Sequence, residues 1–194
     1  MESDPLVVIV TGASAAMLFP TYLIHLKQVV DSEITVLMTK NAERFVRPEV
    51  LGWLNDNVLT CDTSRLNPTQ VALTARGIVV LPASANVLAS AALGLAGSPA
   101  TTTLLAAPAP CLFFPTMNPV MWNKDIVQQH VTTLRSAGHV VIEPELREAF
   151  EIWRKTTTQA RSLPVPAEAA RIVVEWLSDR ESARRLDSEC YASP

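Results

Sequence analysis

The segment Cys111-Leu-Phe-Phe-Pro-Thr-Met-Asn-Pro-Val-Met-Trp122 joins an expected strand to an expected helix. Its apolar run from Cys111 to Phe114 predicts a buried strand, which Pro115 ends. Asn118 then precedes a proline, the order found when asparagine caps a helix and proline takes the first helical position. In an open α/β sheet, ligands bind where strands lead into helices. Asn118 is therefore a helix cap alone or a cap that also belongs to a binding site, and this segment leaves both readings open.

The composition indicates one globular domain. The chain has 194 residues, of which 48% are apolar and 18% are charged, and its net charge is −3. This length is enough for a full hydrophobic core. No cluster of Lys or Arg stands out, so nucleic acid is not expected as a partner. Cys61, Cys111 and Cys190 are far apart and form no CxxC motif, so neither a disulfide framework nor a zinc site is expected.

Further observations set the expected location and limit the chemistry. The first five residues lack the basic region of a signal peptide. The longest apolar stretch, Leu104 to Phe114, contains two prolines and is too short to cross a bilayer. We therefore expect a cytoplasmic protein with no membrane partner. The three histidines, His25, His130 and His139, fall within or at the end of helical patterns and are expected to be packing or surface residues, with no metal site.

Short apolar strands alternate with helical patterns along the chain. Strands are expected at residues 6–10, 34–38, 78–81, 111–114 and 140–142. Helices are expected at residues 16–30, 42–45, 49–55, 70–75, from Asn86 through 95, 119–137 and 167–178, with an aperiodic loop at 56–69. This alternation predicts a single α/β domain, residues 1–179, with a doubly wound and largely parallel sheet. Residues 180–194 are expected to be a charged, flexible tail.

The expected carboxyl ends of four strands carry small or hydroxyl-bearing residues. The turn Thr11–Ala15 contains Gly12 and Ser14, and the later ends carry Thr39, the run Ala83–Asn86, and Thr116 with Asn118. Parallel strands bring such loops to one edge of the sheet. Uncharged polar loops at that edge suit a planar cofactor that bears a phosphate and forms hydrogen bonds. The first turn is neither GxGxxG nor a Walker loop, so by itself it is a weak motif.

Two of these segments resemble the motifs of a known family. Pro82-Ala-Ser-Ala-Asn86 resembles the PASANT motif, and Pro115-Thr-Met-Asn-Pro-Val-Met-Trp122 resembles the PxMNxxMW motif. Both belong to the homo-oligomeric flavin-containing cysteine decarboxylases, and the spacing of the two motifs also fits. That family includes phosphopantothenoylcysteine decarboxylases and the peptidyl-cysteine decarboxylases of epidermin-type lantibiotic biosynthesis. The resemblance covers most of residues 5–160 and implies a Rossmann-like (flavodoxin-like) fold.

The resemblance implies a flavin at the sheet edge, FMN as is usual in the family, with FAD left open. The residues expected around it are Gly12, Ala13, Ser14, Thr39, Phe45, Ala83, Ser84, Ala85, Asn86 and Thr102. In the family, the flavin oxidises the thiol-bearing carbon of a C-terminal cysteine. The resulting thioaldehyde is an electron sink, so that the adjacent carboxylate leaves as CO2 and an enethiol remains.

The resemblance also implies a substrate site next to the flavin. Asn118 would hold the carboxylate of the substrate cysteine as a catalytic residue, and Asn67 is a second catalytic candidate that could orient the substrate. The residues expected to line the site are Asn118, Met121, Phe150, Ile152 and Trp153. The family's members form trimers, often assembled into dodecamers, so a homo-oligomer is implied, with other peptide-modifying enzymes as further partners.

Two departures from the family pattern bear on the reaction. Family members carry a histidine, thought to act as the base, where this chain has Pro68. A thiol with a pKa of about 8.5 is a few per cent ionised at neutral pH, so a dedicated base could be dispensable. The alternative is that the chain binds flavin but does not catalyse the reaction. Phosphopantothenoylcysteine decarboxylases also carry a cysteine in a substrate flap that reduces the enethiol. The corresponding segment here, Ala149–Gln159, has none, and Phe150-Glu-Ile152 resembles the flap of the peptide-specific enzymes.

The sequence therefore favours oxidative decarboxylation of the C-terminal cysteine of a ribosomally made precursor peptide. The product would be an aminoenethiol, the precursor of aminovinyl-cysteine in lantibiotic-type antibiotics. Two alternatives stay open at this point. One is a phosphopantothenoylcysteine decarboxylase of coenzyme A biosynthesis, and the other is a catalytically silent flavin-binding regulatory subunit.

Overall fold

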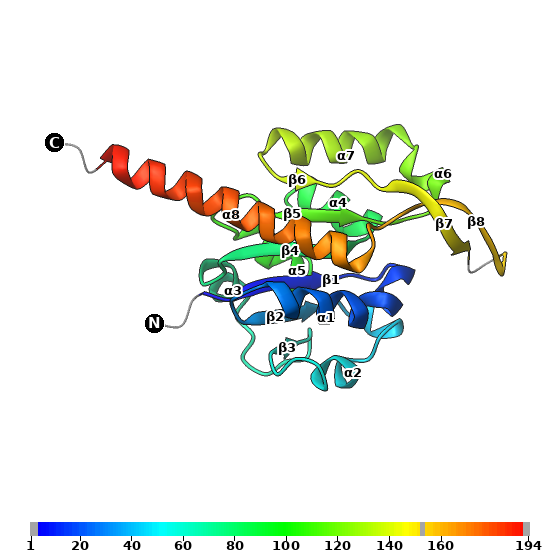
Figure 1. The fold of residues 1–194 in the computed structure, drawn as a ribbon, viewed down its shortest axis with the longest axis horizontal. Coiled ribbons are helices and arrows are strands. Elements are labelled where there is room, and N and C mark those ends of the chain that lie inside the picture. The colour runs from blue at the N-terminus through cyan, green and yellow to red at the C-terminus, as the bar shows by residue number, and fades with distance from the viewer. Residues whose placement is uncertain (1–3, 152–153, 192–194) are drawn as a thin grey trace.

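Six parallel strands form the central sheet of the computed structural model, which describes residues 4–151 and 154–191 (Figure 1). The strands are β1 (Leu6–Val10), β2 (Ile34–Met38), β3 (Val58–Leu59), β4 (Gly77–Ala83), β5 (Leu112–Pro115) and β6 (Val140–Val141). Their order across the sheet is β3-β2-β1-β4-β5-β6. The chain thus starts near the middle, builds outward through β3, and returns to build the other half. The expected doubly wound α/β fold is confirmed.

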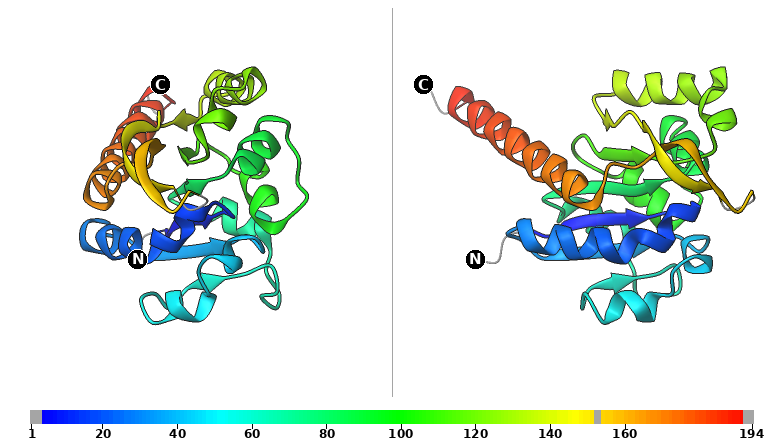
Figure 2. Two further views of the ribbon diagram at one scale, coloured as in Figure 1. Left: turned by 90° about the vertical axis from the view of Figure 1, so that its right-hand side faces the viewer. Right: turned by 45° about the vertical axis from the view of Figure 1, so that its right-hand side comes forward.

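Helices cover both faces of this sheet (Figure 2). They are η1 (Ser14–Leu18), α1 (Phe19–Val29), η2 (Ala42–Arg44), α2 (Pro48–Gly52), α3 (Pro68–Leu73), α4 (Ala85–Ala92), α5 (Pro99–Leu105), α6 (Pro119–Trp122), α7 (Asp125–Ser136) and α8 (Pro166–Tyr191). One apolar cluster joins the sheet to α1 and α8, and a second joins it to α3, α4, α5 and α7. Every residue of β1 is buried because β1 contributes alternate side chains to the two clusters.

Several expected helix boundaries need correction. The helix expected over 119–137 is two helices, because Lys124 is extended and the side chain of Gln128 donates to Trp122 O at 2.6 Å. The helix expected from residue 16 begins as the 3-10 helix η1, and α1 starts at Phe19. The helix expected to reach residue 95 ends at Ala92, before Gly94 with its φ of +66°.

Three further differences from the sequence analysis concern β4, β3 and α5. The strand expected at 78–81 continues through Pro82 to Ala83, because a register shift between Val80 and Ala83 accommodates a residue that has no N–H to donate. The expected loop 56–69 contains β3, which pairs with β2 through only two residues. The sequence reading missed α5, although Ser98 and Pro99 begin it with a capping box that Thr101 completes.

The segment after β6, which includes the counterpart of the family's substrate flap, is an antiparallel hairpin. It consists of β7 (Glu145–Glu151) and β8 (Thr156–Ser162), and it projects from the body on the side where the parallel strands end (Figures 1 and 2). The last helix, α8, extends past residue 179, and Glu181 forms an ion pair with Arg76 at 2.7 Å. Among the helices described, none is both long and apolar enough to cross a membrane.

The contact between β4 and α8 leaves no room for a side chain at Gly77. A Cβ there would lie 2.9 Å from atoms of both Trp176 and Leu177. We expect Gly77→Ala to lower the free energy of unfolding in urea by about 1–3 kcal/mol, because α8 must shift outward. The matched control is Gly52→Ala at the end of α2, where a Cβ meets nothing within 4 Å. Equal stability of the two variants would contradict this packing argument.

Candidate active site

The hydroxyl of Thr11 joins the carboxyl ends of the two central strands. Thr11 follows β1, is 1% exposed, and donates a hydrogen bond to Pro82 O at 2.7 Å. The same oxygen accepts a hydrogen bond from the backbone N–H of Ser84 at 2.9 Å. One side chain thereby fixes the loop after β1 against the loop after β4. Sequence reasoning did not select Thr11 as a site residue, and its position directly after a wholly apolar strand was the available signal.

The loops after β1 and β2 are in direct contact. Gly12 packs so closely on Asn41 that a Cβ at Gly12 would collide with the Asn41 side chain. The backbone N–H of Thr39 donates to Val10 O at 3.0 Å, and this bond holds the starts of the two loops side by side. The Thr39 hydroxyl is buried and has no hydrogen-bond partner among the described residues. It is therefore available to a ligand that carries a polar group into this edge.

A broad depression of about 700 Å³ lies next to Thr39, at the carboxyl end of β2. Phe45 lies on its wall and is 37% exposed. The other lining residues are Lys40, Asn41, Glu43, Arg44, Val46 and Arg47. The exposed ring of Phe45 offers a stacking surface to a planar ligand in this depression.

The PASANT-like run forms the end of β4 and the start of α4. Ala83 is fully buried, while Ser84 caps α4 by accepting from Val87 N at 3.4 Å. Ala85 and Asn86 occupy the first turn of α4, and Asn86 is exposed. Across the sheet, Ala13 and Ser14 begin η1 directly after β1. The structure therefore brings these residues to one edge of the sheet, as expected.

Asn118 lies in the loop after β5, where it caps α6 and also has unpaired N–H donors. Its Oδ1 accepts the Val120 N–H at 2.8 Å and so caps α6. This bond assigns the amide orientation, because Val120 N needs an acceptor, and it leaves the two N–H groups of Nδ2 with no partner in the described part of the chain. Met121 lies one residue beyond Val120 and is 46% exposed. Amide donors beside an exposed thioether suit a small carboxylate-bearing ligand.

The other site candidates are less closely tied to this edge. Asn67 caps α3 by accepting from Gln70 N at 3.2 Å, and Pro68 is the first residue of that helix. Thr102 lies on α5, where its hydroxyl donates to Ser98 O at 2.9 Å. Among residues 4–151 and 154–191, no hydrogen bond links Thr102 to the loops after β1, β2 and β4. Phe150 lies on β7 and is 62% exposed, while Ile152 and Trp153 are outside the described residues.

The histidines and the buried cysteine lie outside this edge. The Nδ1 atom of His139 accepts the Cys111 N–H at 2.9 Å, at the amino end of β5. Burial lowers the pKa of His139, and its ring packs edge-on against Phe113. Burial also raises the pKa of the Cys111 thiol to about 12, so this thiol is unreactive. In the part of the chain that is described, no group of three His, Cys, Asp or Glu side chains could hold a metal ion.

The residues at this edge fit a flavin. The orphaned Thr39 hydroxyl supplies a buried donor, and Gly12 lets the loops after β1 and β2 pack directly against each other beside it. Neither of these groups carries a charge, which suits the neutral ring system of a flavin, and the helix starts of η1 and α4 suit its phosphate.

A substitution tests whether the Thr11 bridge holds this edge together. Thr11→Val keeps the shape of the side chain but leaves Pro82 O and Ser84 N–H without a partner. We expect it to lower the free energy of unfolding in urea by about 1–3 kcal/mol. Thr11→Ser keeps the hydroxyl and serves as the control. Valine and serine variants of equal stability would show that the bridge contributes nothing.

Comparisons with known proteins identify the family. A model of the flavoprotein family matches residues 1–163. Mersacidin decarboxylase of Bacillus sp. (strain HIL-Y85/54728) is 32% identical over 93% of this chain and 94% of its own length. Epidermin decarboxylase of Staphylococcus epidermidis is 30% identical over 68% of this chain and 72% of its own length.

Solved structures of similar proteins have the same fold as this chain. The structure of MrsD from Bacillus sp. HIL-Y85/54728 superposes with a TM-score of 0.78 at 30% identity, over 91% of this chain and 97% of that one. A variant of EpiD in complex with the substrate peptide DSYTC superposes with a TM-score of 0.82 at 26% identity, over 90% of this chain and 99% of that one. The sheet, the edge loops and the two motifs therefore occur together in a chain that belongs to the flavoprotein family.

Proposed function

We propose that this protein is a flavin-dependent decarboxylase of peptides that end in cysteine, acting in lantibiotic-type antibiotic biosynthesis. The observation that carries the proposal is the end-to-end match with mersacidin decarboxylase, which covers 93% of this chain and 94% of that protein. A peptide substrate is supported by the EpiD complex with DSYTC, a peptide that ends in cysteine. The free donors of Asn118 support the same substrate, because a C-terminal residue carries a carboxylate.

The proposed reaction needs an acceptor for electrons. When bound, the flavin, FMN in this proposal, supplies a two-electron oxidation of the thiol-bearing carbon. Asn118 Nδ2 holds the carboxylate and orients it, while Oδ1 stays bonded to Val120 N and fixes the amide plane. The substrate cysteine loses CO2 and two hydrogens, and an aminoenethiol remains. That product is the precursor of aminovinyl-cysteine.

The substrate thiol ionises without a side-chain base in this proposal. Pro68 has no atom that accepts a proton, and Asn67 uses its Oδ1 as the cap of α3. His139 lies at the amino end of β5, at the opposite edge from Asn118. A thiol with a pKa of about 8.5 is a few per cent thiolate at neutral pH, and the thiolate is the reactive form.

Two observations bear on the alternative functions, one observation for each. The bifunctional coenzyme A biosynthesis protein CoaBC of Haemophilus influenzae is 34% identical over 74% of this chain, but the match spans only 37% of that protein. Residues 145–162 contain no cysteine to reduce an enethiol, which weighs against phosphopantothenoylcysteine as substrate. Pro68 favours the other candidate, a flavin-binding subunit without turnover.

We also propose that the protein works as a homo-oligomer of trimers, up to a dodecamer, in the cytoplasm where its precursor peptide is made. Large apolar side chains stay exposed on the elements that surround the edge loops. They are Met17, Leu18, Phe45, Val120 and Met121. A second copy of the chain that covered them would remove this apolar surface from water and would close the site.

Mass spectrometry of peptide products tests the proposed reaction. The flavin-loaded protein is incubated in air with the precursor peptide and with short peptides that end in cysteine. We expect a loss of one CO2 and two hydrogens from cysteine-ended peptides, and no change in the same peptides ending in serine. Unchanged cysteine-ended peptides, with the flavin bound, would instead identify a silent subunit.

Asn118→Ser separates the two roles of Asn118. Serine also caps helices, so the free energy of unfolding is expected to change by only tenths of a kcal/mol. The hydroxyl is too short to reach where Nδ2 reaches, so we expect kcat/KM for the peptide to fall by about 100-fold, because a hydrogen bond to a charged group is lost. Flavin affinity, measured by absorbance titration, should stay unchanged. Full activity in this variant would show that Asn118 only caps α6 and does not bind the substrate.

A further inference from the structure

The β7/β8 hairpin has little apolar attachment to the body. Its large apolar side chains, Leu146 and Phe150, are 66% and 62% exposed. The side chains that are partly covered include Arg147, Thr158 and Ala160, none of which offers a large apolar surface. An isolated two-stranded hairpin is only marginally stable in water. The orientation of this hairpin therefore depends on polar contacts at its base.

Arg147 makes the contact between β7 and α8. Its Nη2 atom lies 2.7 Å from Glu168 Oε2, in the first turn of α8, and 2.7 Å from Glu145 Oε2 on its own strand. The Arg147 and Glu168 side chains are 29% and 30% exposed, so water screens their attraction only in part. Glu168 also lies where the helix dipole favours a negative charge.

The buried Nε of Arg147 has no hydrogen-bond partner among the described atoms. A buried donor without a partner costs free energy, so Arg147 stays in this position only because its ion pairs oppose that cost. Replacement of Glu168 alone would leave the guanidinium with its partner on β7 and with no contact to α8. The hairpin would then be free to turn away from the body.

Other contacts hold the ends of the hairpin. Arg161 forms an ion pair with Glu143 at 3.9 Å, and Glu143 also pairs with Arg135 of α7. Arg161 Nη1 donates to Pro144 O at 3.0 Å, which closes the open end of the two strands. Tyr22 donates its hydroxyl to Pro164 O at 2.7 Å, after β8. Burial raises the pKa of Tyr22 to about 12, so this donor keeps its proton at physiological pH. Only Arg147 reaches from inside the hairpin to another element in these contacts.

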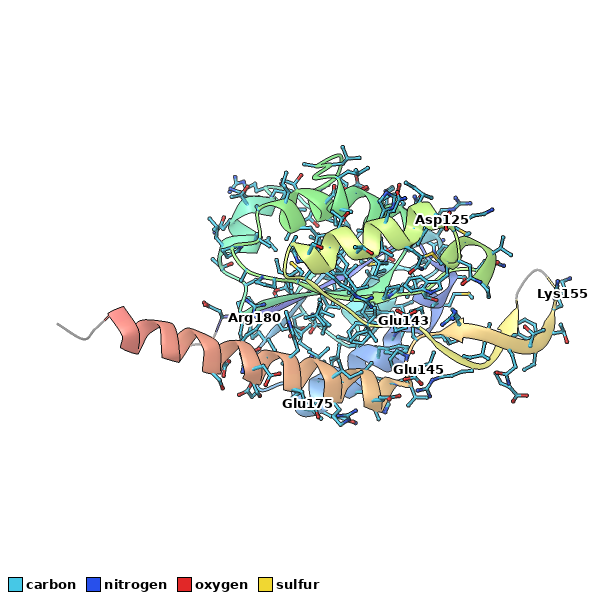
Figure 3. The ribbon with its side chains drawn as sticks, turned by 90° about the horizontal axis from the view of Figure 1, so that it is seen from above. Asp125, Glu143, Glu145, Lys155, Glu175 and Arg180 are labelled. Carbon is cyan, nitrogen blue, oxygen red and sulfur yellow. The ribbon has the colours of Figure 1, made fainter. Side chains whose placement is uncertain are left out.

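We propose that the Arg147–Glu168 ion pair is a positioning contact that sets the pose of the β7/β8 hairpin over the substrate. The proposal rests on the proposed function, in which Phe150 lines the peptide site. It assigns to α8 a residue, Glu168, that touches no substrate and yet controls substrate affinity. Figure 3 shows Glu143 and Glu145 at the base of the hairpin and Lys155 at its tip.

The test compares two neutralised glutamates on one helix. Glu168→Gln removes the charge that pairs with Arg147, whereas Glu175→Gln removes the charge of an exposed i,i+4 pair with Arg171 and changes the net charge equally. We expect Glu168→Gln to raise KM for a cysteine-ended peptide by about fivefold, with kcat within about twofold. Glu175→Gln should change neither constant. A variant carrying Arg147→Met and Glu168→Gln should be no worse than Arg147→Met alone.

A second readout does not depend on activity. Backbone amide hydrogen exchange of β7 and β8, and trypsin cleavage after Lys155, should both be faster in Glu168→Gln than in Glu175→Gln or the unaltered protein. Faster exchange confined to the hairpin supports the positioning contact even if no peptide is turned over. Unchanged exchange and unchanged KM would overturn it, and so would a fall in kcat and in flavin affinity at constant KM.

Discussion

The hydrogen bonds of the Thr11 hydroxyl are the constraint on which the site depends. Strands β1 and β4 are neighbours in the middle of the sheet, and each ends in a loop at the same edge. Parallel pairing aligns the strands, but its last pair is Ile9 with Val80, and it leaves the loops beyond without a ladder. Thr11 continues the connection by binding Pro82 O and Ser84 N–H at once. The loop after β2 is then fixed in turn, because Asn41 packs against Gly12.

Most of the sheet could be predicted because its strands are buried on both faces. The five residues of β1 and the five of β2 are continuous apolar runs or nearly so, and such runs have few alternatives in a chain of this composition. The errors fall where tertiary contacts outweigh local pattern. Strand β3 is two half-buried residues held only by pairing with β2. Helix α5 follows a glycine-containing loop that hides its start, although Ser98 caps it.

The site residues likewise fall into those that local sequence pattern predicts and those that depend on tertiary contacts. Asn118 and the run Ala83–Asn86 could be predicted because they form contiguous motifs with recognisable helix starts. Thr11 could not, because a threonine after a strand is ordinary and its partners are 71 and 73 residues away. The pose of the hairpin is equally hidden, since Arg147 and Glu168 are 21 residues apart on different elements. A sequence motif can indicate contacts between residues that are close in the chain, but it does not indicate contacts between residues that are far apart.

In the proposed function, the group that meets the substrate carboxylate, Asn118, carries no charge, and this has a chemical reason. A guanidinium at the position of Asn118 would bind the carboxylate more tightly through two charge-assisted hydrogen bonds. That gain would stabilise the reactant and not the transition state, in which the carboxylate loses its charge as it becomes CO2. The neutral amide of Asn118 orients the group at a smaller cost to the barrier. An ion pair is found instead at the base of the hairpin, where Arg147 meets Glu168, so that in the proposed function charge positions the hairpin and stays out of the reaction.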